Sequence, residues 1–457
     1  MKKLIILYCI SAWVGLGACS VYKSYERPDM PVVDSLYRQA AATSADTTSI
    51  ASLSWRELFT DPKLQALIET GLQNNTDLNI ARLKVTEAEA TLMTSRLAYL
   101  PSISFEPSGT LRSVDGNAMT KSYDIAASAS WEVDIFGKLT NAKRGAKAAL
   151  EQSEAYRQAV QTQLIATIAN SYYSLLMLDA QLDISERTAA IWGENVRAMK
   201  ALKAAGDATE LAVAQSEASK LSVDASIASL RQQIDQMENT LTALLGIAPQ
   251  KIDRTTIEEQ LFPSELAAGV PLQLLQRRPD VRQSEAALAQ AFYATNAARA
   301  AFYPSITLSG SAGWTNAAGA AITNPGQWLF TAVGSLVQPL FNRGKNIANL
   351  RIAKAQQEEA LLSFRQSLLD AGTDVNNALI QWQTARQRQQ IDQQQILSLE
   401  STVRSSELLM QYSSQNYLEV LTARQTLLQA ELTAVSDRFD EIQGVINLYH
   451  ALGGGAE

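Results

Sequence analysis

Cysteine and histidine are almost missing from this sequence. Its two cysteines, Cys9 and Cys19, both lie within the first twenty residues, so the body of the chain must be stabilised by burial and helix packing without disulfides. The one histidine, His450, falls in the last turn of the last predicted helix, where a cation or a helix cap is expected. There is no Cys/His cluster for a metal and no glycine-rich phosphate motif. We therefore expect no metal site, no catalytic constellation, no cofactor and no enzyme activity.

Excess positive charge and long apolar runs are also lacking. Lys and Arg number 39 against 46 Asp and Glu, which gives a formal net charge of −7. Such a balance argues against a nucleic-acid partner. After the first twenty residues no stretch approaches the ~20 consecutive apolar residues of a membrane-spanning helix. A membrane could then be reached only through a lipid anchor or through β-strands, which are individually inconspicuous in a sequence.

The first residues have the layout of a secretory signal peptide. A short cationic start precedes an apolar run over 4–16, and small residues then lead into Cys19. The stretch "LGAC" (16–19) also resembles the bacterial lipobox, in which cleavage leaves the cysteine as a lipidated first residue. We predict a lipoprotein signal peptide at 1–18, a lipid on Cys19 and an extended lipidated segment over 19–61. An ordinary signal peptide that ends by chance at a cysteine is the alternative.

The remaining chain shows two tandem copies of one unit of about 205 residues. "LAYLPSIS" at 97–104 returns as "AAFYPSIT" at 300–307, and the two copies end in "TALLG" and "HALGGG". Each copy reads as a helix, two strands, a long helix and a return helix. We place the copies at 62–250 and 251–457.

Strand alternation recurs at matching places in both copies. Within 123–133 every second residue is apolar or aromatic, while most residues between them are polar. This pattern predicts a β-strand with one apolar face. Similar strands are predicted over 103–111, 306–314 and 328–339. Aromatic residues near the strand ends are typical of membrane barrels, although a single hairpin of this kind is more often a soluble β-ribbon.

The helices between these strands are unusually long. Residues 138–204 contain no proline and carry an apolar stripe, so we predict one helix of about 100 Å. A helix over 62–100 should begin with Asp61 as its N-cap and Pro62 at its first position. The return helix over 208–246 carries a heptad seam, which predicts coiled-coil packing.

Four strands are too few to close a barrel. In lipid, an open sheet edge leaves unpaired backbone groups that cost several kcal/mol each. The strands must therefore be shared between copies of the chain, and three copies would give twelve strands, an even number within the bacterial range. The predicted fold class is mainly α with membrane β, in two tandem repeats: a shared β-barrel continued by a long α-helical coiled-coil barrel.

Several longer motifs resemble those of the TolC-like outer-membrane factors, in the lipoprotein NodT/OprM-type branch. In chain order they are "YERPDMP" (25–31), "WRELFTDPKLQALIETGLQNNTDLNIA" (55–81), "WEVDIFGK" (131–138), "LLQRRPDVRQSEAAL" (274–288), "FYPSITL" (302–308), "QPLFNRG" (338–344) and "YLEVLTARQTLL" (417–428). Together they extend over nearly the whole mature chain. The RRPD stretch followed by the Tyr-Pro-Ser strand start is the most specific part.

The resemblance implies a homotrimer with a 12-stranded β-barrel, four strands per chain, in the outer membrane of a Gram-negative bacterium. A helical tunnel would extend into the periplasm. The protein would be the exit duct of a tripartite efflux system with a periplasmic adaptor and an inner-membrane RND-type pump. No Asp follows Cys19 directly, so the common inner-membrane retention signal of lipoproteins is missing, which agrees with an outer-membrane lipid anchor.

In this family, the turns between long and return helices form the periplasmic mouth. The family's acidic position in the second turn corresponds to Glu419, and we predict that three copies of Glu419 converge at the closed mouth. Asp207, Glu210 and Arg424 would support them. The family's next acid is Thr422 here, which departs from a double acidic ring. The alternative is that Glu419 is an ordinary surface residue of a helix.

The tips themselves are the predicted adaptor contact, with Gly206 and Leu211 in the first turn and Ser413 and Leu418 in the second. Ser413 stands where the family has a glycine. Two other functions remain open at this point. A protein-secretion duct of the same fold would differ only in its partners. A periplasmic coiled-coil scaffold lipoprotein without a pore would leave the apolar strands without a role.

Overall fold

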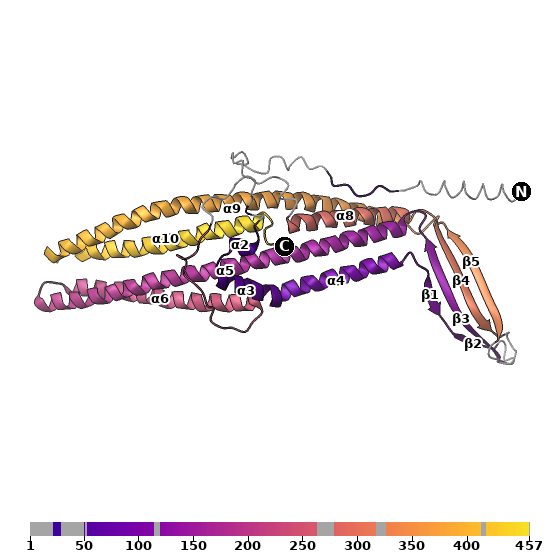
Figure 1. Ribbon diagram of the computed structural model, residues 1–457, viewed down its shortest axis with the longest axis horizontal. Helices are drawn as coiled ribbons and strands as arrows, with labels where there is room; N and C mark the ends of the chain where they lie inside the picture. The colour runs from indigo at the N-terminus through magenta and orange to yellow at the C-terminus, as the bar shows by residue number, and fades with distance from the viewer. Residues whose placement is uncertain are drawn as a thin grey trace. The chain divides into compact units, whose positions relative to one another are not determined.

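The computed structural model describes residues 22–28, 50, 53–113, 119–262, 278–316, 326–412 and 417–456. The helices are α2 Trp55–Leu58, α3 Pro62–Asn74, α4 Thr76–Leu97, α5 Lys138–Ala205, α6 Glu210–Leu245, α8 Pro279–Ala300, α9 Lys345–Tyr412 and α10 Tyr417–Ala451 (Figure 1). The strands are β1 Ser102–Phe105, β2 Ser108–Arg112, β3 Thr120–Val133, β4 Ser305–Thr315 and β5 Gln327–Val337. No helix of the described ranges is both long and apolar enough to cross a membrane.

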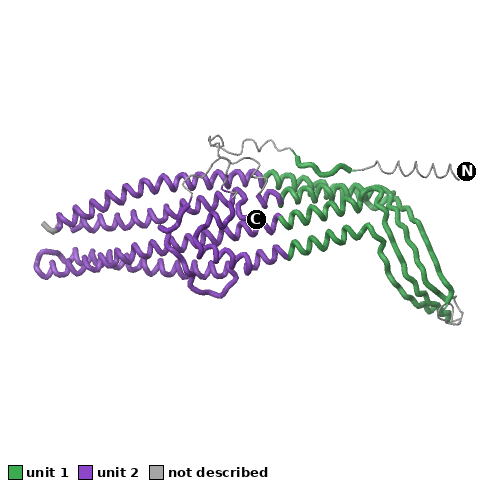
Figure 2. The backbone as a smooth tube through the Cα atoms, viewed as in Figure 1, with its two compact units in different colours: residues 1–30, 83–154, 283–366 green, residues 31–82, 155–282, 367–457 purple. Residues whose placement is uncertain are grey.

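Two compact units share these elements (Figure 2). Unit 1 comprises residues 1–30, 83–154 and 283–366, and unit 2 comprises residues 31–82, 155–282 and 367–457. Each unit takes segments from both of the predicted copies. Corresponding elements of those copies match in length, since α4 and α8 have 22 residues each and α5 and α9 have 68 each.

Unit 1 contains one antiparallel sheet. β1 and β2 both pair with β3, at 127–130 and at 120–124, so together they form one edge strand that is interrupted near Pro107. Proline has no N–H to give to a ladder and is found at edges and interruptions for that reason. The strand predicted over 103–111 is therefore present in two pieces. β3 pairs with β4 and β4 with β5, which is the second edge.

The register of the sheet confirms the predicted apolar face. Ile125, Trp314 and Trp328 are aligned across three neighbouring strands, so their side chains lie on one side. The other side is rich in hydroxyls, and Ser104 Oγ lies 2.7 Å from Ser128 Oγ. β5 is exposed along its whole length, and Trp328 has 80% of its surface accessible in the single chain.

A short segment before the helices of unit 1, residues 22–28, contacts α8 through an aromatic side chain and an ion pair. Within residues 22–28, Arg27 forms an ion pair with Glu285 of α8, and the Tyr25 ring packs edge-on against Phe292 at 5.8 Å between centroids. The Tyr25 backbone N–H also donates to the Tyr293 hydroxyl at 3.3 Å. The segment that follows the predicted lipid site is thus held on α8 at Tyr25 and Arg27. Cys19 itself lies outside the described residues.

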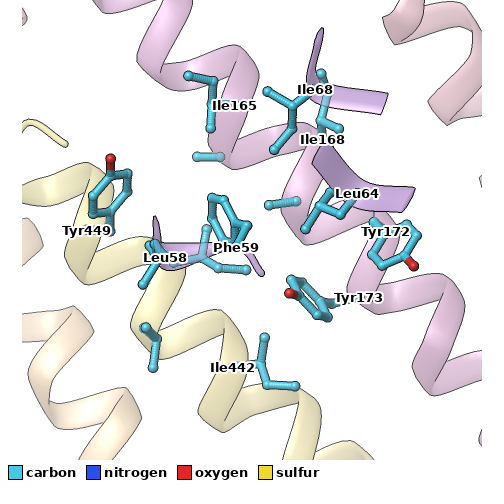
Figure 3. Packing of buried hydrophobic residues seen from close by; sticks show 14 of the residues in the cluster. Leu58, Phe59, Leu64, Ile68, Ile165, Ile168, Tyr172, Tyr173, Ile442 and Tyr449 are labelled. Atoms are coloured by element: carbon cyan, nitrogen blue, oxygen red, sulfur yellow. The ribbon is translucent and has the colours of Figure 1, made fainter. Parts of the chain in front are cut away.

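Unit 2 is built on a hydrophobic core that contains residues from both of the tandem repeats. Leu64 and Ile68 of α3, Ile168 of α5 and Ile442 of α10 are almost completely buried together (Figure 3). The stripe predicted on α5 and the heptad seam predicted on α6 both contribute to this cluster, for example through Ile168 and Leu241. The prediction of coiled-coil-like helix contacts from that seam is confirmed here by burial.

Two details of the N-terminal half differ from the prediction. The helix expected over 62–100 breaks at Asn75, whose side chain accepts from the Leu78 N–H and donates to Leu244 O, both at 2.9 Å. Asn75 thereby caps α4 and holds the end of α6. The segment expected to be extended up to residue 61 ends in α2, because Trp55 and Leu58 have an apolar core to enter.

Asp61 is the N-cap of α3, as predicted, and its carboxylate does more than cap. It accepts hydrogen bonds from the Lys63 N–H at 2.8 Å, the Tyr172 hydroxyl at 2.6 Å, Gln260 at 3.1 Å and Thr255. Burial alone would raise the pKa of Asp61, but these donors together lower it below the ordinary value. The stability it contributes is therefore present above the ordinary carboxyl pKa and is lost as the pH falls through the lowered one.

Arg278 of the RRPD stretch joins three helices of unit 2. It is 4% exposed, donates to Asp280 at 2.7 Å and Asp374 at 2.9 Å, and caps the end of α10 through Ala451 O at 2.8 Å. Burial and the nearby Arg278 charge lower the pKa of His450. Of the two roles expected for His450, a cation or a helix cap, the lowered pKa disfavours the cation.

We expect Arg278→Met to lower the free energy of unfolding by about 1–3 kcal/mol, because two half-exposed carboxylates and a helix-end carbonyl lose their partner. The measurement is the unfolding transition of the purified protein in detergent, followed by helical circular dichroism. Arg197→Met is the matched control, since the Arg197 side chain is 78% exposed and should cost less than about 1 kcal/mol. Equal stability of the two variants would contradict this role.

Candidate functional site

The turn between α5 and α6 has the tight geometry that the sequence predicts. Gly206 adopts φ +89°, which favours glycine. Its N–H donates to Lys203 O at 3.0 Å, and the Asp207 N–H donates to Leu202 O at 2.9 Å, which closes the end of α5 as a Schellman motif. Thr209 then caps α6 by accepting from the Ala212 N–H at 3.2 Å.

The structure places the four predicted gate residues at two hairpin ends of unit 2. Asp207 is exposed in the first turn, and Glu210 forms an ion pair with Lys203. Glu419 is exposed in the first turn of α10. Arg424 is paired with Glu407 of α9, so Glu210 and Arg424 are each engaged within their own hairpin. Convergence of Glu419 needs further copies of the chain and stays a prediction.

The predicted adaptor contact is solvent-accessible where it can be described. Gly206 is exposed, Leu211 is 66% exposed and Leu418 is 57% exposed. Ser413 lies outside the described residues. Large apolar side chains at this exposure are free to contact a partner protein.

A groove of about 690 Å³ runs between α9 and α10 beside Glu419. Its walls combine apolar and hydroxyl side chains, including Leu409, Leu418, Ser405 and Thr422. Glu419 is thus at the margin of a mixed apolar and hydroxyl surface. The described residues contain no group of three or more His, Cys, Asp or Glu arranged to hold a metal ion.

Sequence reasoning missed the contact that joins the two hairpins. Ser216 of α6 and Tyr417 of α10 share a hydrogen bond of 2.6 Å between their hydroxyls, and both residues are buried. Met199 and Val213 pack around them. A signal was present, because Ser216 stands seven residues before Val223 and so occupies a seam position. A polar residue on a buried seam needs a partner.

Proteins of known structure and name share this whole architecture. The chain is 31% identical to the cation efflux system protein CusC of Escherichia coli O6:H1 over 98% of each chain. It is 29% identical to the probable efflux pump outer membrane protein TtgC of Pseudomonas putida, over 100% of this chain and 96% of TtgC. The open-state structure of the Neisseria gonorrhoeae MtrE outer membrane channel matches with TM-score 0.87 and 28% identity, covering 96% of this chain and 99% of MtrE.

Fold and relatives together define the class: this is an efflux channel protein of the outer membrane. The family model for the outer membrane efflux protein matches residues 67–247 and 270–454. The chain belongs to that family, and the TolC-like resemblance is confirmed. The family consists of transport proteins rather than enzymes.

We expect Tyr417→Phe to loosen the contact between the hairpins, because it leaves the buried Ser216 hydroxyl without its partner at a cost of about 1–2 kcal/mol. Amide hydrogen exchange at the start of α10 should become about five- to thirtyfold faster. Thr426→Ala is the control, since that exposed hydroxyl bonds only to the Thr422 carbonyl of its own helix. Unchanged exchange in Tyr417→Phe would show that the hydroxyl pair contributes nothing to the contact.

Proposed function

We propose that this protein is the exit duct of a tripartite efflux system, working as a lipid-anchored homotrimer. Each chain would give its four strand positions to a 12-stranded barrel, and its helices would form a tunnel into the periplasm. A periplasmic adaptor and an inner-membrane RND-type pump would deliver the cargo. The duct would be passive, since free energy for transport comes from the pump.

The observation that carries this proposal is the sheet with two open edges and one apolar face. Neither β1/β2 nor β5 has a partner on its outer side within the described part of the chain. Lipid does not tolerate unpaired backbone groups, so the two edges must pair, and pairing β5 of one copy with β1/β2 of the next satisfies both. Two tandem repeats in three copies supply twelve strands and matching helical columns.

The lipid on Cys19 would add a second attachment to the outer membrane. Tyr25 and Arg27 contact α8 in unit 1, which also holds the strands, so the acylated cysteine would lie six residues before the first of these contacts. The acyl chains would then enter the inner leaflet close to that unit. One relative, SilC of Salmonella typhimurium, is named a probable outer membrane lipoprotein and is 28% identical.

The cargo would be small molecules that the pump selects. Relatives of similar identity are named for cations, as CusC, and for toluene, as TtgC of another Pseudomonas putida strain. Cargo therefore varies among these relatives while the outer-membrane part is retained. The hydroxyl-rich side of the sheet is suited to an inner wall that holds no charged cargo strongly.

The second candidate is a periplasmic scaffold without a pore, and one pair of variants separates it from the duct. Ala332 lies on the apolar face in the middle of β5, and Thr331 lies on the opposite face. In a barrel, Ala332→Arg puts a charge into lipid at a cost of about 2–4 kcal/mol and should reduce the yield of detergent-stable trimer severalfold. Thr331→Arg should assemble normally and change ion conductance.

The scaffold predicts something else for the same pair. Both positions are exposed in the single chain, so both arginines would be tolerated and neither protein would conduct ions. The readouts are trimer mass in detergent and conductance in a planar bilayer. A monomer that extracts without detergent would overturn the duct.

We also expect Glu419→Ala to alter the mouth, if three carboxylates converge there as proposed. Removing like charges that repel at close range should raise single-channel conductance and weaken block by divalent cations by about tenfold. Glu194→Ala is the control, because that side chain is 77% exposed on α5. Unchanged conductance and unchanged cation block would contradict the predicted convergence and show that Glu419 is an ordinary surface residue.

A further inference from the structure

The two helical hairpins of unit 2 differ in the charges that face each other across them. Opposite charges meet across the first hairpin, α5–α6. Going toward its turn, the pairs are Arg231 with Glu186, Lys200 with Glu217, and Lys203 with Glu210. Each of these three contacts joins a cationic side chain to a carboxylate, so protonation of the carboxylate would weaken the contact rather than strengthen it.

The second hairpin, α9–α10, is also crossed by ion pairs, such as Arg424 with Glu407 and Arg386 with Glu441, but in addition it contains a buried layer in which two acids meet. Asp437 of α10 is 1% exposed and faces Asp392 of α9, which is 8% exposed. Arg388 of α9 contacts Asp437 and also lies 3.6 Å from Asp440, so its charge is divided between two carboxylates. On the third neighbouring helix, α5, Gln181 contacts the adjacent Ser436 and carries no charge.

Hydrogen bonds do not compensate for this burial. Both carboxylate oxygens of Asp437 and Oδ2 of Asp392 lack a hydrogen bond of ordinary geometry from any group in the described ranges. A buried carboxylate whose one cationic contact, Arg388, is shared with Asp440 remains costly, whereas a protonated carboxyl can donate to the carboxylate beside it. One proton shared by Asp392 and Asp437 would satisfy both.

A second acidic pair lies nearer the turn on the same two helices. Glu431 of α10 is half-buried and faces Glu400 of α9, with Arg187 of α5 as the opposing charge. Burial raises the pKa of Glu431 and outweighs the Arg187 charge, which lowers it, while the Glu400 charge adds a smaller rise. The α9–α10 contact therefore contains two layers in which burial favours the protonated form of a carboxyl.

Burial and the shared hydrogen bond with Asp392 raise the pKa of Asp437 to about 6, against the opposing effect of Arg388. A carboxyl whose pKa is higher in the packed state binds protons better there than in the separated state. Its contribution to packing is therefore full at low pH, and it is lost as the pH rises through about 6.

We propose that α9–α10 is a pH-responsive hairpin, in which a proton shared between Asp392 and Asp437 holds the two helices together and its loss loosens them. The α5–α6 hairpin, held by opposite charges, would not loosen with it. The inference concerns packing within one chain, so it holds or fails independently of the exit-duct proposal. In a working duct, loss of the shared proton would make α9–α10 the hairpin whose helices separate more readily at neutral and alkaline pH.

Amide hydrogen exchange of the full chain in detergent at pH 5.0 and pH 7.5 tests this directly. Labelling times are scaled to the intrinsic exchange rate at each pH, and α5–α6 peptides in the same sample serve as the internal reference. Relative to them, exchange in α9–α10 should be about tenfold faster at pH 7.5 than at pH 5.0. An equal response of the two hairpins would overturn the proposal.

Two variants identify the groups responsible. Asp437→Asn and Asp392→Asn each replace one acid by an amide that can donate to the other, so either should keep α9–α10 protected at pH 7.5 and remove most of the pH dependence. Glu194→Gln, on the exposed surface of α5, should behave as the unmodified protein. If both Asn variants fold and retain the original tenfold response, the acidic pair is not the cause. If neither folds, the comparison of hairpins in the unmodified protein still decides.

Discussion

Backbone N–H and C=O groups at the edge of a sheet cannot remain unpaired in lipid, and this constraint governs the rest of the molecule. A chain with the strand positions of one small sheet has two such edges, β1/β2 and β5. In the proposed duct, closure comes from other copies, and those copies would have to hold their strands at equal heights. Long helices that pack in register can supply that alignment, which gives a physical reason for a protein with little β-structure to devote most of its residues to helices.

Within unit 2, rigid and yielding contacts are distributed unevenly. The core around Leu64, Ile168 and Ile442 is fully apolar and draws on both halves of the sequence. Arg278 and Asp61 add buried polar contacts in which the charged groups have several partners. Toward the turns, the apolar clusters become smaller, as around Trp192 and Met199, and polar contacts such as the hydroxyl pair of Ser216 and Tyr417 accompany them. Local stability should therefore fall toward the mouth.

Local rules accounted for most of the elements, while partners at a distance accounted for the exceptions. The caps at Asp61 and Gly206 and the alternation of β3 follow from their own neighbours in the chain. The break at Asn75 could not be predicted from its neighbours, because the Asn75 side-chain amide donates to the Leu244 carbonyl, which lies 169 positions away in the sequence. The same holds for α2, whose few residues form a helix only because Trp55 and Leu58 are buried by other helices.

The sequence by itself determined the two matching halves, the long helices, the strand faces and the family, since each depends on spacing and residue type along the chain. Tertiary structure alone decided which charges meet. Arg424 contacts Glu407, Glu210 contacts Lys203, and Asp437 is buried against Asp392. Charge carries no periodicity that reveals its partner, because a pair forms wherever helix register and rotation bring two side chains within a few ångströms, and both are fixed by packing of the whole unit.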